Sequence, residues 1–143
     1  MATRIPRNAV TFTIPYLPNV AVLGTNARRR THWAVQRKAQ KADFGTWWGY
    51  ILHQLDGAAP PHFSEARVDV ELVFKTARTR DIDNLMAACK PLFDALKQSG
   101  VIHADDSECL EPHITVSVDK ARAPLTVVTV TDAALALVKR ALG

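Results

Sequence analysis

Four stretches of the chain alternate hydrophobic and polar residues, which is the pattern of β-strands with one buried face. They cover residues 9–15, 66–76, 113–119 and 125–131. The alternation is most regular in the second stretch, where the hydrophobic positions in phase are Val68, Val70, Leu72 and Phe74. The pattern therefore predicts four strands, each contributing one face to a hydrophobic core.

Two longer stretches repeat hydrophobic residues at spacings of three and four, which is typical of amphipathic helices. The first, over residues 31–55, has a predicted buried stripe of Phe44, Trp47, Trp48, Ile51, Leu52 and Leu55. The second, over residues 85–98, carries Leu85, Cys89, Leu92, Phe93 and Leu96 on one face. Pro91 lies inside the second helix, and proline removes one helical hydrogen bond, so we expect a kink or a new start near Lys90.

A short last helix is predicted after Asp132, with Leu135, Val138 and Leu142 on its apolar face, and residues 16–30 are predicted to form a long loop. The element order is therefore β-α-β-α-β-β-α. We expect a single α+β domain over residues 1–143, with a mixed four-stranded sheet packed by helices.

Composition fits this fold class, since 48% of the 143 residues are hydrophobic and 22% are charged. No stretch approaches eighteen consecutive apolar residues, and the first residues lack the apolar run of a signal peptide, so we expect a cytoplasmic protein without a membrane segment. Cys89 and Cys109 form no CxxC pair and are expected to be reduced thiols.

The net charge is only +4, but positive charge is concentrated in the first third of the chain, where Asp43 is the only acid before residue 50. The basic residues there are Arg4, Arg7, Arg28, Arg29, Arg30, Arg37, Lys38 and Lys41. Clustered cations bind polyanions by releasing counterions, although they also occur on solvated helix faces. Trp33, beside the arginines and outside the predicted buried stripe, is the tryptophan expected to touch nucleic acid.

Acidic residues concentrate in two short motifs, RTRDIDNLMAACK at residues 78–90 and HADDSE at residues 103–108. In an extended segment Asp81 and Asp83 would share a face that suits Mg2+, with Ile82 turned to the core. The alternatives are a helix cap at Asp81 and a polar turn at residues 104–108. If the motifs converge, a metal would relieve the repulsion among their carboxylates, and His103 could join the site.

No other catalytic pattern fits these residues. An EF-hand loop needs a further oxygen ligand and a glycine where the chain has Leu85 and Met86. The histidines show no HExxH spacing, and no serine or cysteine lies in a nucleophile motif. The chemistry that the acids favour is metal-assisted hydrolysis.

The segments RDIDNL, KPLFDAL and GVIHADDSE resemble the central signature of the RusA-type Holliday junction resolvases, over about residues 78–111. This resemblance implies a dimeric endonuclease, often encoded by phages or prophages, that nicks four-way DNA junctions in recombination and repair with Mg2+ or Mn2+. It implies catalytic, metal-binding roles for Asp81, Asp83 and Asp106, with Asp105 as a further metal ligand.

The chain departs from the family pattern at one position. The family has a functional lysine four residues after the second acid, where this chain has Ala87. Counting back from the Asp-Ala-Leu segment places the lysine at Lys90, which would steady negative charge at the scissile phosphate. The alternative is a solvated helix lysine.

The predicted helix at residues 85–98 is about 20 Å long at 1.5 Å per residue. We expect the segment after it to run back along the helix and deliver Asp105 and Asp106 to the helix start. The cations expected to hold the DNA backbone are Arg28, Arg29, Arg30, Arg37, Lys38, Arg78 and Arg80.

Alternative functions are a related nuclease acting on flaps, forks or RNA–DNA hybrids, and a DNA-binding module without catalysis. Paired nicking of a junction also implies a homodimer. Its interface is expected at a strand edge, at the last helix or at the apolar loop 17–23.

Overall fold

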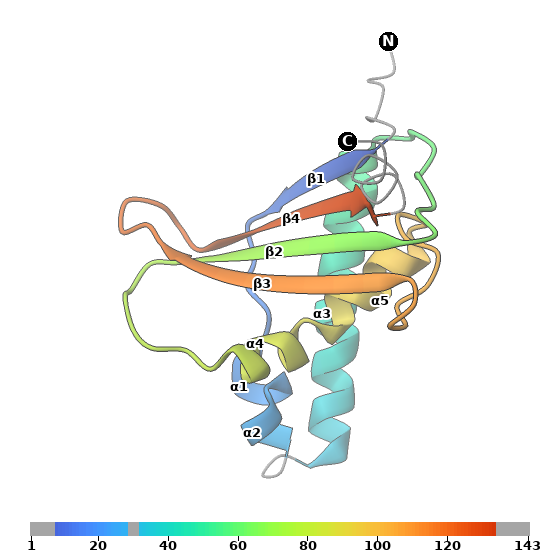
Figure 1. Ribbon diagram of the computed structural model, residues 1–143. Helices are drawn as coiled ribbons and strands as arrows, with labels where there is room; N and C mark the ends of the chain where they lie inside the picture. The colour runs from blue at the N-terminus through green and yellow to red at the C-terminus, as the bar shows by residue number, and fades with distance from the viewer. Residues whose placement is uncertain (1–7, 29–31, 134–143) are drawn as a thin grey trace.

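The computed structural model describes residues 8–28 and 32–133, which form a mixed four-stranded sheet with helices against one face (Figure 1). The strands are β1 (Ala9–Ile14), β2 (Ala66–Phe74), β3 (Leu110–Val118) and β4 (Leu125–Asp132). Their order is β1-β4-β2-β3, with β2 and β3 parallel and the other two pairs antiparallel. The predicted α+β class and mixed sheet are confirmed.

The helices in the described residues are α1 (Val20–Leu23), α2 (Thr25–Arg28), α3 (Trp33–Leu55), α4 (Ile82–Ala88) and α5 (Lys90–Gln98). In Figure 1, α3 and α5 lie behind the sheet, and α3 continues past the β3 edge towards α1 and α2. The last helix predicted after Asp132 lies outside the described residues. No described helix is long and apolar enough to cross a lipid bilayer.

The sheet separates a buried face from a polar one, as the alternation predicts. Val68, Val70 and Leu72 of β2 are fully buried against the helices, together with Phe12 and Ile14 of β1 and Val128 and Val130 of β4. The alternate positions of β2, Arg67, Asp69 and Glu71, are at least partly exposed. Hydrophobic burial on one face therefore fixes the register of the central strands.

The segment after β1 contains more structure than predicted, because α1 and α2 occupy part of the expected loop. Asn19 begins α1 by accepting a hydrogen bond from the backbone N–H of Val22 at 3.3 Å. Leu23 is buried, and Leu17 and Val20 pack against the core. The apolar character of this loop is thus explained by packing within the chain.

α3 buries a narrower stripe than predicted. Trp47, Ile51 and Leu55 are buried, whereas Trp48 is 41% exposed and Leu52 is 39% exposed. Consecutive helical residues differ by about 100° around the axis, so Trp48 and Leu52 point away from the face that meets the sheet. The prediction was wrong for these two residues because hydrophobic spacing alone does not tell how wide the covered face is.

The crossover from β2 to β3 contains two helices separated at Cys89, as Pro91 predicts. Cys89 ends α4 and also precedes α5, with Pro91 in the first turn of α5, where its missing N–H costs no helical hydrogen bond. Burial raises the pKa of the Cys89 thiol to about 12, so it is a packing residue. A new helix therefore starts at Lys90.

Asp43 ties the loop after β1 to α3. Its side chain is 1% exposed and accepts hydrogen bonds from the Tyr16 hydroxyl and from the backbone N–H of Asn19, the latter at 3.0 Å. Tyr16 meets the Trp47 ring edge-on, with centroids 5.0 Å apart. Burial, and then the contact with Asp43, raises the pKa of Tyr16 to about 12.

Replacing Asp43 with alanine should lower the free energy of unfolding by about 3 kcal/mol, because the Tyr16 hydroxyl and the Asn19 N–H both lose a charged acceptor. Urea denaturation measures the change. Lys38→Ala, at an exposed position of the same helix, is the control and should shift stability by less than about 0.5 kcal/mol. A loss below about 1 kcal/mol for Asp43→Ala would show that this contact does not hold the loop.

Candidate functional site

The Asp-Ile-Asp motif at residues 81–83 begins α4. Asp81 is the N-cap, with φ −81° and ψ 115°, and its carboxylate accepts a hydrogen bond from the backbone N–H of Asp83 at 2.9 Å. Asp83 lies in the first turn, and Ile82 is 47% exposed. The expected extended segment with Ile82 in the core is therefore wrong, because the helix starts one residue after Asp81 and the free N–H of Asp83 binds the Asp81 carboxylate.

Asn84 fastens the start of α4 to α2 and was not among the predicted site residues. Its amide oxygen accepts a hydrogen bond from the backbone N–H of Asn26 at 3.0 Å. Beside it, the Thr25 hydroxyl donates to the carbonyl of Asp83 at 3.4 Å. Asn84 belongs to the Asp-Ile-Asp-Asn-Leu motif, which was the available signal, but its partner lies 58 residues earlier in the chain.

Arg80 holds the loop that precedes the motif. Its guanidinium lies 3.6 Å from the centroid of the Phe74 ring and donates hydrogen bonds to the carbonyls of Thr76 and Arg78, at 3.0 and 3.2 Å. A hollow of about 450 Å³ is lined by Val20, Phe74, Arg78, Thr79, Arg80, Asp81, Asn84 and Leu85. Arg78 and Arg80, predicted to bind the DNA backbone, thus lie beside Asp81.

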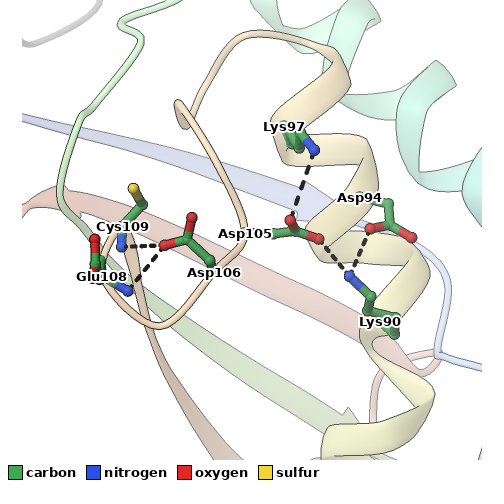
Figure 2. Close-up of polar contacts among 7 residues, drawn as sticks. All are labelled: Lys90, Asp94, Lys97, Asp105, Asp106, Glu108 and Cys109. Carbon is green, nitrogen blue, oxygen red and sulfur yellow. Dashed lines mark hydrogen bonds and ion pairs between the residues drawn. The ribbon is translucent and has the colours of Figure 1, made fainter.

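The second acidic pair separates its two side chains, as Figure 2 shows. Asp106 points into its own turn, where its carboxylate accepts hydrogen bonds from the backbone N–H groups of Glu108 and Cys109, both at 3.0 Å. Asp105 points towards α5. Asp106 thus satisfies the polar-turn alternative, because it binds the free donors of the turn that enters β3.

Lys90 joins two carboxylates at the start of α5 (Figure 2). Its ammonium group donates to Asp94 at 2.9 Å and to Asp105, and Lys97 lies 3.9 Å from the other oxygen of Asp105. The segment after α5 therefore runs back along that helix, as predicted. It brings Asp105 to the start of α5, whereas the prediction placed it at the start of the whole crossover helix.

These contacts shift the acidity of all three partners. The hydrogen bond from Lys90 lowers the pKa of Asp105 to about 2. The hydrogen bond to Asp105 raises the pKa of Lys90, and burial raises the pKa of Asp94. At neutral pH, Lys90 is therefore a charged group that two acids hold in place.

A second hollow, of about 470 Å³, lies between the end of the first motif, at residues 86–90, and the acidic pair of the second. Its lining residues are Met86, Ala87, Lys90, Phe93, Asp105, Asp106, Ser107, Leu110 and Pro112. Asp83 lies three and four residues before Met86 and Ala87, so it shares their helix face. The hollow is therefore bordered by α4, the first turn of α5 and the turn at residues 105–107.

The predicted metal ligands do not form one cluster. Asp81 lines the first hollow, and Asp105 and Asp106 line the second. Among residues 8–28 and 32–133, no group of three or more His, Cys, Asp or Glu side chains is arranged to hold a metal ion, and His103 is exposed. The described residues do not fit a preformed centre of three carboxylates.

The predicted DNA-binding cations of the described chain lie in three regions. Arg37 and Lys38 are exposed in α3, and Arg78 and Arg80 belong to the loop before α4. Arg29 and Arg30 lie outside the described residues, and Arg28 is the last residue of α2.

No protein-family model and no curated protein matches this chain.

Replacing Asp105 with asparagine should lower the free energy of unfolding by about 1 kcal/mol at pH 7, since Lys90 loses one of its two acids and is itself half exposed. Because the pKa of Asp105 is lower in the folded protein than in the unfolded chain, ionised Asp105 stabilises the fold. This stabilisation is complete above about pH 4 and disappears as the pH falls towards about 2. Urea denaturation at pH 7 and pH 3 should show the difference shrink. Glu108→Gln, an exposed acid in the same turn, is the matched control; an Asp105→Asn deficit independent of pH would contradict this assignment.

Proposed function

We propose that this protein is a Mg2+-dependent, structure-specific endodeoxyribonuclease that resolves four-way DNA junctions by paired nicking. The proposal places it with the RusA-type resolvases, which the motifs at residues 78–111 resemble. We further propose that it acts in DNA recombination and repair, as those enzymes do.

The observation that supports the proposal most directly is the hollow between the end of the first motif and the acidic pair of the second. Lys90, Asp105 and Asp106 line it, although Lys90 and Asp105 are fifteen residues apart. The α4 face that borders it begins at Asp83. Three of the five motif residues with proposed catalytic or metal-binding roles thus meet at one concave surface, and a fourth lies on the adjoining helix face.

In the proposed reaction, the cations hold the sugar-phosphate backbone while the acids act at the scissile phosphate. Lys90 would leave its acids to steady negative charge on the phosphate. Asp81, Asp83 and Asp106 are exposed, so their carboxylates are open to solvent. Mg2+ commonly takes one or two protein carboxylates together with water and phosphate oxygens, so its proposed role does not require a preformed protein cage.

A DNA-binding module without catalysis is the second candidate, and specific contacts favour it. Asp81 and Asp106 bind backbone N–H groups, and Lys90 is held by two carboxylates. These arrangements stabilise the fold without any reaction. The two candidates differ in whether the acids are needed for cutting or only for folding.

Asp81→Asn, Asp83→Asn and Asp106→Asn should each reduce junction cleavage at least about 100-fold while leaving junction binding equal or stronger, since acid–phosphate repulsion falls. Asparagine caps helices about as well as aspartate, so folding should survive. Labelled junction, fork, flap and RNA–DNA hybrid substrates, each with and without Mg2+, identify the preferred substrate.

Glu108→Gln is the control for loss of an acid beside the same turn and should cleave as the wild type does. Absence of cleavage of all four substrates by the wild type, with binding retained, would favour the module without catalysis. If one asparagine variant cleaves junctions as fast as the wild type does, the residue replaced in it has no catalytic role.

We also propose a homodimer, because a four-way junction is nearly two-fold symmetric and paired nicking needs two acidic sites. The candidate interface is the sheet edge at β3, since no strand of the described residues pairs with its outer side and Val116 and Val118 are 36% and 42% exposed. With the loop at residues 17–23 packed on the core, β3 is the stronger of the predicted alternatives in the described chain.

Light scattering should give a mass of twice 15.8 kDa at micromolar concentration. Mixed dimers of wild-type and Asp83→Asn chains should nick a junction once without releasing paired duplex products. A monomer that makes both cuts would contradict the dimer, and Val116→Lys should separate the subunits if β3 forms the interface.

A further inference from the structure

One face of α3 combines aromatic and basic side chains. Its members are spaced at three and four residues, which places them within about 80° around the helix axis. They are Trp33, Arg37, Lys41, Phe44 and Trp48. We call this set the α3 aromatic face.

The two tryptophan rings of this face are exposed to solvent, whereas Phe44 is partly buried against the core. Trp33 is 63% exposed and Trp48 is 41% exposed, whereas Trp47 between them in sequence is fully buried. The ring of Phe44 is stacked on that of Trp48, with an interplanar angle of 13° and centroids 6.3 Å apart. At the other end, the Arg37 guanidinium lies 5.0 Å from the Trp33 ring centroid. Neither tryptophan is needed to fill the core.

The charge of the face is entirely positive within the described part of α3. Arg37 and Lys41 lie between the aromatic residues, and the only acid of α3, Asp43, is buried and bound to Tyr16 and Asn19. A shallow hollow of about 430 Å³ lies beside this face. It is lined by Arg37, Gln40, Lys41 and Phe44 of α3 and by Asp94 of α5. Asp94 is paired with Lys90, which offsets its charge.

We propose that the α3 aromatic face binds single-stranded DNA, with unpaired bases stacked on Trp33 and Trp48 and phosphates held by Arg37 and Lys41. Stacking platforms interleaved with cations suit a flexible polyanion that has free base faces. Duplex DNA offers no such faces, because its bases stack on one another. An acidic protein surface would pair with the cations but would leave the exposed indole rings without a specific partner.

The inference rests on the proposed function only in taking DNA as the polymer, because flaps and forks, the alternative substrates, carry single-stranded arms. It adds stacking contacts at Trp33 and Trp48, which have no role in the proposed cleavage. The face is separate from the hollow lined by Lys90, Asp105 and Asp106, with no residue in common. Binding and cutting can therefore be tested apart.

The experiment measures fluorescence anisotropy of a labelled oligothymidine of about 15 nucleotides, a length that covers sites of the usual size, with chelator present to prevent cleavage. Trp33→Ala and Trp48→Ala should each weaken binding about tenfold, as loss of one stacked base implies. Tyr50→Ala removes an aromatic residue that is 37% exposed on another side of α3 and should leave binding unchanged. Quenching of tryptophan fluorescence by the oligonucleotide should fall in both Trp variants.

Charge on the face is tested by salt dependence. The Arg37→Ala, Lys41→Ala double variant should lower the slope of log K against log salt by about 1.4, since each phosphate contact contributes about 0.7 for a single strand. The Lys120→Ala variant, which removes an exposed cation from the loop between β3 and β4, should lower it by much less.

Wild-type affinity in folded Trp33→Ala and Trp48→Ala proteins would overturn the proposal. If Trp48→Ala lowers the melting temperature, the affinity of the Trp33→Ala protein alone decides the test. Trp33 is the more exposed of the two, so its loss disturbs folding less. Tighter binding of a matched RNA strand, or of duplex DNA, would also overturn it. Junction cleavage without single-strand binding would defeat this inference alone, whereas single-strand binding without cleavage of any substrate would defeat the nuclease proposal alone.

Discussion

Parallel pairing of β2 and β3 is the constraint on which the rest of the described structure depends. The two strands pair over nine residues each, from Ala66 beside Leu110 to Phe74 beside Val118. The end of β2 and the start of β3 therefore lie about 26 Å apart, at 3.3 Å per residue. The chain must travel back between them, and α4 and α5 make that return. Asp81 follows the first end and Asp106 precedes the second, so the pairing itself separates the two acidic motifs.

The interruption at Cys89 determines how the motifs still make contact. Lys90, the first residue of α5, follows Ile82 by eight residues, which correspond to about 12 Å of helical rise at 1.5 Å per residue. Lys90 forms an ion pair with Asp105. The other oxygen of Asp105 lies 3.9 Å from Lys97, which is about two helical turns further along α5. Asp105 thus fixes the turn before β3 to α5 by charge. The next residue, Asp106, is hydrogen-bonded to the backbone of the turn itself. Local polar contacts account for both acids of the pair.

Much of the sheet could be predicted from the sequence, because alternation reports burial of one face and Val68, Val70 and Leu72 all follow it. The break near Lys90 could also be predicted, since proline acts through its own backbone. The candidate site was harder to predict, because the same sequence allows a carboxylate before a helix to act either as a helix cap or as a metal ligand. Asp81 and Asn84 depend on where helices begin and on segments far away in the chain. Trp48 was misplaced because spacing gives a helix face but not the width of what covers it.

The length of α3 has a consequence for how this protein can change over generations. Its 23 residues rise about 34 Å, whereas the outer strands of a four-stranded sheet lie only about 14 Å apart. The first half of the helix therefore projects beyond the core and is steadied by Asp43 and its neighbours. Substitutions at the projecting positions remove little buried surface, so selection can alter them at small cost in folding. The fold thereby separates the residues on which folding depends from exposed residues that can change with little effect on folding.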